Sequence, residues 1–203
     1  MRKKIIFDLG NVLIDYNPSR IVKTVFSNPE EQALIFQEVF QSEGWRQLDQ
    51  GLITFEEHYQ KLASRFPQYA DKINWLLKNW HMDQPSIPGM YDLIVNVNNA
   101  GYPLYILSNA NTRYYTFKKY MDIFKFFSGI TLSSELHFLK PQKEIYDRFC
   151  QIHNLVPDEC LFIDDKIENV QGAINAGWQA HQFVGVNELK NFLENHLSIQ
   201  LTD

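Results

Sequence analysis

The sequence has few cysteines, no long apolar run and no excess of positive charge. Its 203 residues include only two cysteines, which is too few for the disulfide framework of a small secreted domain. No apolar stretch approaches the roughly 20 residues that a membrane-spanning helix requires. The formal net charge is −5, so there is no general electrostatic reason to bind nucleic acid. These absences exclude a disulfide scaffold and a membrane protein, and they argue against a nucleic-acid partner.

The sequence also has no low-complexity tract, no repeat, no heptad pattern and no metal-ligand spacing among its six histidines. We therefore interpret the histidines as structural, and the sequence predicts no particular oligomeric state. A first strand is predicted directly after Lys4, which leaves no room for a secretory signal, so we expect a cytoplasmic protein. With 45% hydrophobic residues, the chain is long enough to bury a sizeable core.

Five short apolar runs predict the strands of a sheet. They are rich in β-branched and aromatic residues and lie at 5–7, 103–107, 129–133, 160–163 and 178–184. Helical patterns are present at 88–100, 142–153, 167–176 and 187–197. Gly101 and Gly177 follow two of these helices, and Asn187 is the expected cap of the last one. Strands that alternate with helices are typical of an α/β fold with a parallel, Rossmann-like sheet.

The segment 16–86 interrupts this alternation with helices only. A capping Asn precedes a Pro at the first helical position twice, at Asn17-Pro18 and Asn28-Pro29. A further helix opens with a capping box at Thr54. A helical block of this length is too long for an ordinary crossover. We therefore expect an all-helical cap domain at 16–86, inserted into an α/β core formed by 1–15 and 87–203. An ordinary helical subdomain without a gating role is the alternative.

Acidic residues end two of the predicted strands. Asp8 follows the first strand, and Asp164-Asp165 follow the fourth. The carboxyl ends of parallel strands form the edge at which open α/β sheets bind ligands, so these carboxylates are expected to meet there. Carboxylates that lie close together repel one another unless they share a cation, and hard oxygen ligands suit Mg²⁺. The alternative for each residue is simple capping of the loop or helix that follows.

Two further polar groups lie at places that favour a nearby anion. Ser108-Asn109 end the second strand, before a helix expected to run through Lys119, so unpaired backbone N–H groups beside Ser108 would suit an anion. Lys140 precedes Pro141 at a helix start, where a cation is unfavourable unless an anion lies close by. A simple helix cap and a solvated surface lysine are the alternative interpretations.

Taken together and in this order, these elements resemble the motifs of the haloacid dehalogenase superfamily of hydrolases. The matching stretches are Phe7-Asp8-Leu9-Gly10-Asn11-Val12-Leu13, Leu107-Ser108-Asn109, Lys140-Pro141, and Phe162-Ile163-Asp164-Asp165 with Asn169. The helical block at 16–86 lies where this family inserts its helical cap. The resemblance spans nearly the whole chain, and it implies a hydrolase.

The resemblance also implies a role for each matched residue. Asp8 would attack phosphorus and form an aspartyl-phosphate, which water then hydrolyses. Mg²⁺ would be bound by Asp8, the backbone carbonyl of Gly10 and Asp165, with Asp164 in a supporting or direct role. The groups that would bind or neutralise the phosphate are Ser108 and Lys140, with Asn109 and Asn169 in support. Phosphoryl transfer needs chiefly such positioning and cations, because its transition state spreads negative charge over oxygens.

Gly10 departs from the family pattern. Most phosphatases of this family carry a second Asp at this position, which protonates the leaving group and then activates water. Glycine can do neither, and general acid–base help is worth roughly 10²- to 10⁴-fold in rate. Another side chain could supply the proton, with Asp15 or a cap residue as candidates. Alternatively, the substrate has a better leaving group, or the protein binds its ligand without turnover.

The leading hypothesis is a Mg²⁺-dependent phosphatase of a small phosphorylated metabolite. A sugar phosphate is a candidate substrate, because the sequence around Asp8 resembles a branch that includes a sugar-1-phosphate phosphatase. A dehalogenase using Asp8 on carbon would need no metal, and the Asp164-Asp165 pair argues against it. The third hypothesis is a catalytically idle phosphate-binding protein.

Two residues of the expected cap are candidates for substrate contacts. Trp45 could stack on a substrate ring, and Arg46 could bind an anion. The alternative is that Trp45 belongs to the core of the lid and that Arg46 is a solvated charge.

Overall fold

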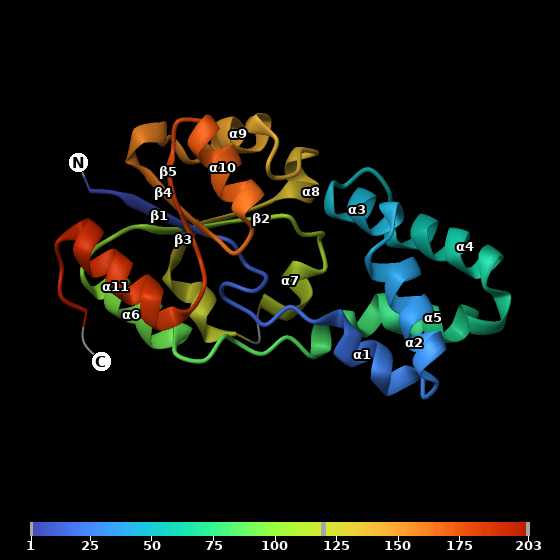
Figure 1. Ribbon diagram of the computed structural model, residues 1–203. Helices are drawn as coiled ribbons and strands as arrows, with labels where there is room; N and C mark the ends of the chain where they lie inside the picture. The colour runs from blue at the N-terminus through green and yellow to red at the C-terminus, as the bar shows by residue number, and fades with distance from the viewer. Residues whose placement is uncertain (1, 119–120, 202–203) are drawn as a thin grey trace.

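A five-stranded parallel sheet forms the centre of the molecule (Figure 1). The computed structural model describes residues 2–118 and 121–201. The strands are β1 (Lys4–Phe7), β2 (Leu104–Ser108), β3 (Phe127–Leu132), β4 (Cys160–Asp164) and β5 (Gln179–Gln182), in the spatial order β3-β2-β1-β4-β5. This arrangement confirms the predicted α/β fold with a Rossmann-like parallel sheet. None of the helices described is long and apolar enough to cross a membrane.

The register of the central strands brings their carboxyl ends to one edge. In β1, Phe7 is the partner of Ile106 in β2 and of Ile163 in β4. Because β1 lies between these two strands, Asp8 is placed between the ends of both. The ends of three strands that lie far apart in the sequence therefore share one corner of the sheet, as the strand-end pattern predicts.

Helices cover both faces of the sheet. Figure 1 shows α6 (Met90–Asn99) and α11 (Val186–Leu197) on one side, and α9 (Lys143–His153) and α10 (Ile167–Asn175) on the other. Ile5 and Phe7 pack in the cluster that includes α6 and α11, whereas Ile6 packs with residues of α9 and α10. Side chains of successive strand residues point to opposite faces, so a strand covered on both faces must be apolar throughout.

A separate group of helices lies beyond the strand ends, to the right in Figure 1. It contains α1 (Pro18–Val25), α2 (Pro29–Ile35), α3 (Glu43–Asp49), α4 (Phe55–Arg65) and α5 (Ala70–Asn79), with a π-helical turn at Phe36–Phe40. These helices share a hydrophobic cluster of their own, which contains no residue of the sheet. The sequence predicts helices and no strand for this segment, and the described residues of the segment form helices and turns. The division into domains at 16–86 remains a proposal.

Local signals gave several helix starts correctly. Pro18 and Pro29 both begin helices, and Thr54 forms the predicted capping box with Glu57. The side chain of Asn28 accepts a hydrogen bond from a backbone N–H, but that of Asn17 caps no helix and bonds to the Ser19 hydroxyl instead.

Several expected helix starts were wrong. Pro141 lies outside α9, whose N-cap is Gln142, and Pro88 lies outside α6, whose N-cap is Gly89. Gly185 precedes α11, so Asn187 lies inside the helix and is not its cap. After Asn109 the chain forms a loop, and the helix α7 (Tyr114–Phe117) begins later and is short. The side chain of Asn111 accepts a hydrogen bond from the Arg113 N–H, which stabilises the loop conformation before α7. The backbone beside Ser108 is therefore a loop and not a helix end; Lys119 lies outside the described residues.

The remaining elements are short and connect the main ones. They comprise α8 (Ser133–Leu136) and 3₁₀ turns at Pro67–Tyr69, Trp80–Met82, Asp122–Phe126 and Pro157–Glu159. The loop after α8 carries Lys140-Pro141 to α10, where Gly172 allows a close approach. A Cβ atom on Gly172 would lie 2.7 Å from Pro141 Cβ and 2.8 Å from its carbonyl oxygen. Only glycine fits at this contact without a shift of one segment.

We therefore expect Gly172→Ala to destabilise the protein. Alanine favours helix by about 1 kcal/mol over glycine, whereas overpacking of this kind costs about 1–3 kcal/mol, so the net change should be a loss of stability. Urea denaturation followed by circular dichroism measures it. Gln171→Ala, at an exposed position of the same helix, is the control. An increase in the free energy of unfolding for Gly172→Ala would show that the contact is not tight.

Candidate active site

Three carboxylates meet at the carboxyl edge of the sheet. Asp8, Asp164 and Asp165 each offer an oxygen atom, and these atoms all lie within 4.8 Å of one another. Asp8 follows β1 and Asp164 ends β4, so their meeting follows directly from the pairing of these two strands. Asp164 is completely buried and Asp8 is 7% exposed. The predicted convergence of acidic strand ends is therefore present.

Lys140 joins two of these carboxylates. Its Nζ atom lies 2.8 Å from Asp8 Oδ1 and 2.6 Å from Asp164 Oδ2, and its side chain is 1% exposed. A buried ammonium is costly unless it is paired, and here two carboxylates pair with it. Lys140 is therefore not a solvated surface lysine. Three ionised carboxylates and one ammonium leave the cluster with negative charge in excess, which favours a further cation.

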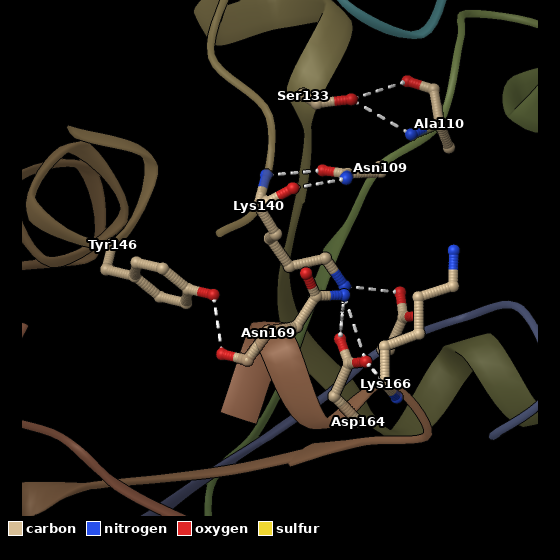
Figure 2. A network of polar contacts seen from close by, with 9 residues as sticks. Asn109, Ala110, Ser133, Lys140, Tyr146, Asp164, Lys166 and Asn169 are labelled. Carbon is tan, nitrogen blue, oxygen red and sulfur yellow. Dashed lines mark hydrogen bonds and ion pairs between the residues drawn. The ribbon is translucent and has the colours of Figure 1, made fainter. Parts of the chain in front are cut away.

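Amide side chains hold this cluster in place (Figure 2). Asn109 receives a hydrogen bond from the Lys140 backbone N–H at 2.8 Å and donates one to its carbonyl at 3.0 Å. The Asn169 amide donates to both oxygens of Asp164, at 3.0 and 3.1 Å. Asn109 and Asn169 therefore fix the positions of the charged groups without carrying charge themselves.

Tyr146 is a supporting residue that sequence reasoning missed. Its hydroxyl donates a 2.8 Å hydrogen bond to the Asn169 backbone carbonyl (Figure 2). Its ring packs against Phe162 and Trp178. The helical spacing of aromatic residues indicates a core position, and this is correct for the ring. No local pattern in the sequence identifies the partner of the hydroxyl, because that partner lies in another helix.

Burial shifts the pKa values of the charged groups. It raises the pKa of Asp8 to about 6, although the neighbouring Lys140 acts in the opposite direction. The pKa of Asp165 is also raised, by burial and by the negative charge of Asp164. For Lys140, burial opposes the charged form, but Asp8 and Asp164 outweigh it and raise the pKa of the ammonium. Lys140 is therefore a fixed positive charge at neutral pH.

The hydrogen bonds distinguish the two adjacent aspartates. Both oxygens of Asp164 are occupied, by Lys140, by Asn169 and by the backbone N–H of Lys166 at 2.9 Å. By contrast, Asp165 Oδ1 is buried and has no hydrogen-bond partner among the described residues. A buried carboxylate oxygen without a donor is unfavourable. The donor set of hard oxygens and this free oxygen fit a divalent cation such as Mg²⁺.

A pocket of about 470 Å³ opens above the cluster. Most of the predicted site residues line it: Asp8, Gly10, Ser108, Asn109, Lys140, Asp165 and Asn169. Asp164 is not among the lining residues, in keeping with its complete burial. The pocket thus brings the predicted residues to a common space large enough for a small molecule.

The helical group provides the opposite wall of the pocket. Trp45 lines it and is 5% exposed, with its ring packed against Phe40 and Trp80. It is therefore both core of the helical group and pocket wall. Arg46 also lines the pocket, but its side chain is exposed and makes a 3.4 Å contact with Glu43.

Asp15, a candidate proton donor, lies outside this pocket. Its carboxylate forms a 2.6 Å ion pair with Arg20, which also pairs with Asp83. It is not among the residues that line the pocket.

These observations define a class of protein, namely an α/β protein with a buried carboxylate–lysine cluster at the carboxyl edge of its parallel sheet and a group of helices between β1 and β2. The family model of haloacid dehalogenase-like hydrolases matches residues 3–177. The chain belongs to this family, as the order of its strand-end motifs predicts.

Relatives of known activity cover most of the chain. A sesquiterpene phosphatase of Aspergillus oryzae is 27% identical over 176 residues, which are 86% of each chain. A D-ribitol-5-phosphate phosphatase of Bacteroides thetaiotaomicron is 23% identical over 90% of this chain and 92% of its own. Among solved structures, a haloacid dehalogenase family enzyme of B. thetaiotaomicron, in complex with magnesium and inorganic phosphate, has a TM-score of 0.69. It is 23% identical, and the match covers 90% of this chain and 94% of that one.

Lys140→Met should destabilise the protein, because two carboxylates would remain buried without their counter-ion. Removing one partner of a buried ion pair costs about 3–5 kcal/mol. The pKa of Asp8 in the folded state already lies above its ordinary value, so Asp8 takes up a proton as the pH falls. The loss should therefore be greatest above about pH 7 and should shrink towards about pH 5. Urea denaturation in the presence of a chelator measures this dependence.

Lys143→Met is the matched control for this variant. Lys143 is exposed and pairs with Asp147 one helical turn away, so its loss should cost at most about 1 kcal/mol. Equal effects of the two substitutions would contradict the importance of the buried pair.

Proposed function

We propose that the protein is a Mg²⁺-dependent phosphatase that hydrolyses a small phosphorylated metabolite through an aspartyl-phosphate on Asp8. The observation that carries this proposal is the buried Lys140, which pairs with Asp8 and Asp164 beside the unpaired carboxylate oxygen of Asp165. The phosphatase activity of both relatives and the magnesium and phosphate in the related structure support it. The resemblance of the motifs around Asp8 supports the choice of nucleophile.

In this proposal the residues of the chain hold the phosphoryl group for attack. Asp8 attacks phosphorus, and Lys140 keeps the carboxylate ionised and attracts the phosphate oxygens. Ser108 and Asn109 lie at the same pocket wall, where Ser108 binds phosphate oxygens and Asn109 fixes Lys140. Such positioning and charge provide most of the catalysis in phosphoryl transfer.

The occupied hydrogen bonds support different roles for Asp164, at the end of β4, and Asp165, which follows it. We assign Asp8, Asp165 and the backbone carbonyl of Gly10 to direct contact with the metal. Asp164 already accepts four hydrogen bonds, so in this proposal it does not contact the metal and instead orients Lys140. When bound, Mg²⁺ supplies positive charge for the developing negative charge of the phosphoryl group.

The two alternative functions fit the site less well. A dehalogenase displaces halide from carbon and needs no metal, but the excess negative charge and the free Asp165 oxygen favour a cation. Halide release in the presence of a chelator would reverse this ranking. An idle phosphate-binding protein is suggested only by Gly10, and binding without turnover across a broad panel of phosphate esters would favour it.

Asp8→Asn should abolish phosphate release, because an amide cannot act as the nucleophile. Phosphate release from a panel of phosphate esters, with and without Mg²⁺, measures it. Asp147→Asn, which changes an exposed carboxylate on α9, should retain full activity and is the matched control. Full activity of Asp8→Asn would overturn the proposed mechanism, and metal-independent activity of the wild type would overturn the role of Mg²⁺.

The aromatic wall of the pocket narrows the substrate class. Trp45, Phe40 and Trp80 offer apolar surface to whatever lies above the phosphate site, while Arg46 stands at the pocket edge. We infer a phosphomonoester whose alcohol carries a ring, such as a sugar or another cyclic body. Aromatic faces bind the apolar side of such rings.

The expected result is a higher kcat/KM for ring-bearing phosphate esters than for glycerol phosphate. Burial of each additional CH₂ group contributes about 0.8 kcal/mol, so a ring should raise kcat/KM by at least about 10-fold. Steady-state kinetics on paired esters measure it. Equal values for the two kinds of ester would show that the aromatic wall does not contact the substrate.

A further inference from the structure

The proposed reaction lacks a proton donor at the usual place. Gly10 has no side chain, yet an alkoxide leaving group needs a proton as the bond to phosphorus breaks. A Cβ atom at Gly10 would lie 3.3 Å from Tyr16 Cβ, so this position is also closely packed. The donor must therefore come from elsewhere in the pocket, and the following inference rests on the proposed phosphatase function.

The pocket offers a small choice of acidic side chains. Among the described residues that line it, only Asp8, Asp49 and Asp165 are acidic. Asp8 is the proposed nucleophile, and Asp165 is a proposed metal ligand. Asp49, at the end of α3 in the helical group, has no role in the proposed mechanism so far.

Contacts with the sheet domain hold Asp49 over the pocket. The Ser133 hydroxyl donates a hydrogen bond to the Asp49 backbone carbonyl. The next residue, Gln50, donates a 2.8 Å hydrogen bond to the His137 carbonyl and accepts one from the His137 ring at 3.1 Å. Gly51 follows with a positive φ of 70°, and a Cβ atom there would lie 2.2 Å from the Ser134 carbonyl oxygen. This docking fixes Asp49 against the half of the protein that carries Asp8.

The side chain of Asp49 bridges the two halves of the pocket. Its Oδ1 atom accepts a 2.8 Å hydrogen bond from Asn111, which lies in the loop after β2 and also lines the pocket. Trp45, in the preceding turn of α3, lowers the pKa of the carboxyl and so favours its charged form. The carboxyl is thus oriented by Asn111, and no lysine or arginine forms a salt bridge with it among the described residues.

This environment favours a carboxyl that exchanges protons near neutral pH. Burial raises the pKa of Asp49 to about 7, while hydrogen bonds from Asn111 and Trp45 and the charge of Lys166 act in the opposite direction. Tyr16 also faces it, and its own pKa is raised by burial and by Asp49, so the phenol stays neutral. His137 contacts the adjacent Gln50, and Arg46 and Tyr114 line the same pocket as Asp49. Acid–base catalysis is most effective when the pKa of the group lies near the working pH.

We propose that Asp49 is the general acid and general base of this enzyme, in place of the side chain missing at Gly10. In the first step an Asp8 oxygen bonds to phosphorus and the ester P–O bond breaks, while the Asp49 carboxyl transfers its proton to the departing alkoxide. In the second step a water oxygen bonds to phosphorus and the bond to Asp8 breaks, while the Asp49 carboxylate takes the water proton. Alcohol and phosphate leave, and both aspartates return to their initial states.

Asp49→Asn tests this proposal through the leaving group. The wild type and the variant are assayed with Mg²⁺ on 4-nitrophenyl phosphate, whose leaving group needs no proton, and on the primary alkyl phosphate that the wild type hydrolyses fastest. We expect kcat/KM of the variant to fall by about 10²- to 10⁴-fold on the alkyl ester and by less than about 10-fold on the aryl ester. A merely structural role of Asp49 would reduce both by the same factor.

The pH profile gives an independent readout. Asp49 must be protonated for the first step, so wild-type kcat/KM on the alkyl ester should decline above about pH 7 as the carboxyl loses its proton. This decline should be absent from the Asp49→Asn variant. Equal losses on both esters, or an unchanged alkaline decline in the variant, would overturn the proposal. A wild type that hydrolyses only aryl phosphates would also overturn it, because such an enzyme works without an acid.

Two further variants separate this inference from the proposed function. Asp15→Asn removes the other candidate carboxylate, which pairs with Arg20 outside the pocket, and should leave the ratio of alkyl to aryl rates unchanged. A changed ratio would move the acid role to Asp15. Asp8→Asn should abolish hydrolysis of both esters. Full activity of that variant, or no hydrolysis of any ester by the wild type, would refute the proposed function, whereas the ester-specific result concerns Asp49 alone.

Discussion

The ion pairs of Lys140 with Asp8 and Asp164 are the interaction on which the site depends. Parallel strands place two carboxylates at one buried corner, where their mutual repulsion opposes folding. A lysine 2.8 and 2.6 Å away offsets that repulsion, and each group makes the burial of the others tolerable. Asn109 and Asn169 then fix the lysine and a carboxylate through their amides. The proposed binding site is therefore built from groups that also have to be satisfied for the protein to fold.

The two halves of the molecule contribute different properties to the pocket. The sheet edge provides charge, and its geometry is set by backbone register and therefore tolerates little displacement. The helical group provides aromatic surface through Trp45 and a half-buried carboxyl through Asp49. This division agrees with a common pattern, in which a rigid scaffold positions the reactive groups and an inserted segment selects the substrate.

Sequence patterns predicted the parts of the structure that depend on local signals or on strand ends. Apolar runs predicted the five strands, the polar residues at their ends predicted Asp8, Ser108, Asp164 and Asp165, and the Lys-Pro pair before an expected helix predicted Lys140. The register of a parallel sheet turns position in a strand into position in space, so this inference needs no contact information. Asp49 and Tyr146 could not be assigned in this way, because their partners lie in other elements. The helix expected after Asn109 is short and begins only at Tyr114, because the Asn111 side chain, bonded to Asp49 and to its own loop, replaces a helical turn.

An acid carried by the helical group makes catalysis depend on how that group is docked. If the nucleophile and the acid stood on the same strand-end loop, the reactive pair would exist whether or not the helices closed over the substrate. With Asp49 as the acid, proton transfer becomes possible only when the 49–51 segment contacts α8, as in the structure. In this docked arrangement the carboxyl is half-buried, and desolvation raises its pKa to about 7. Closure would therefore exclude bulk water, orient the acid and set its proton affinity in one event. In an open enzyme, no general base would lie beside the aspartyl-phosphate to activate the attacking water.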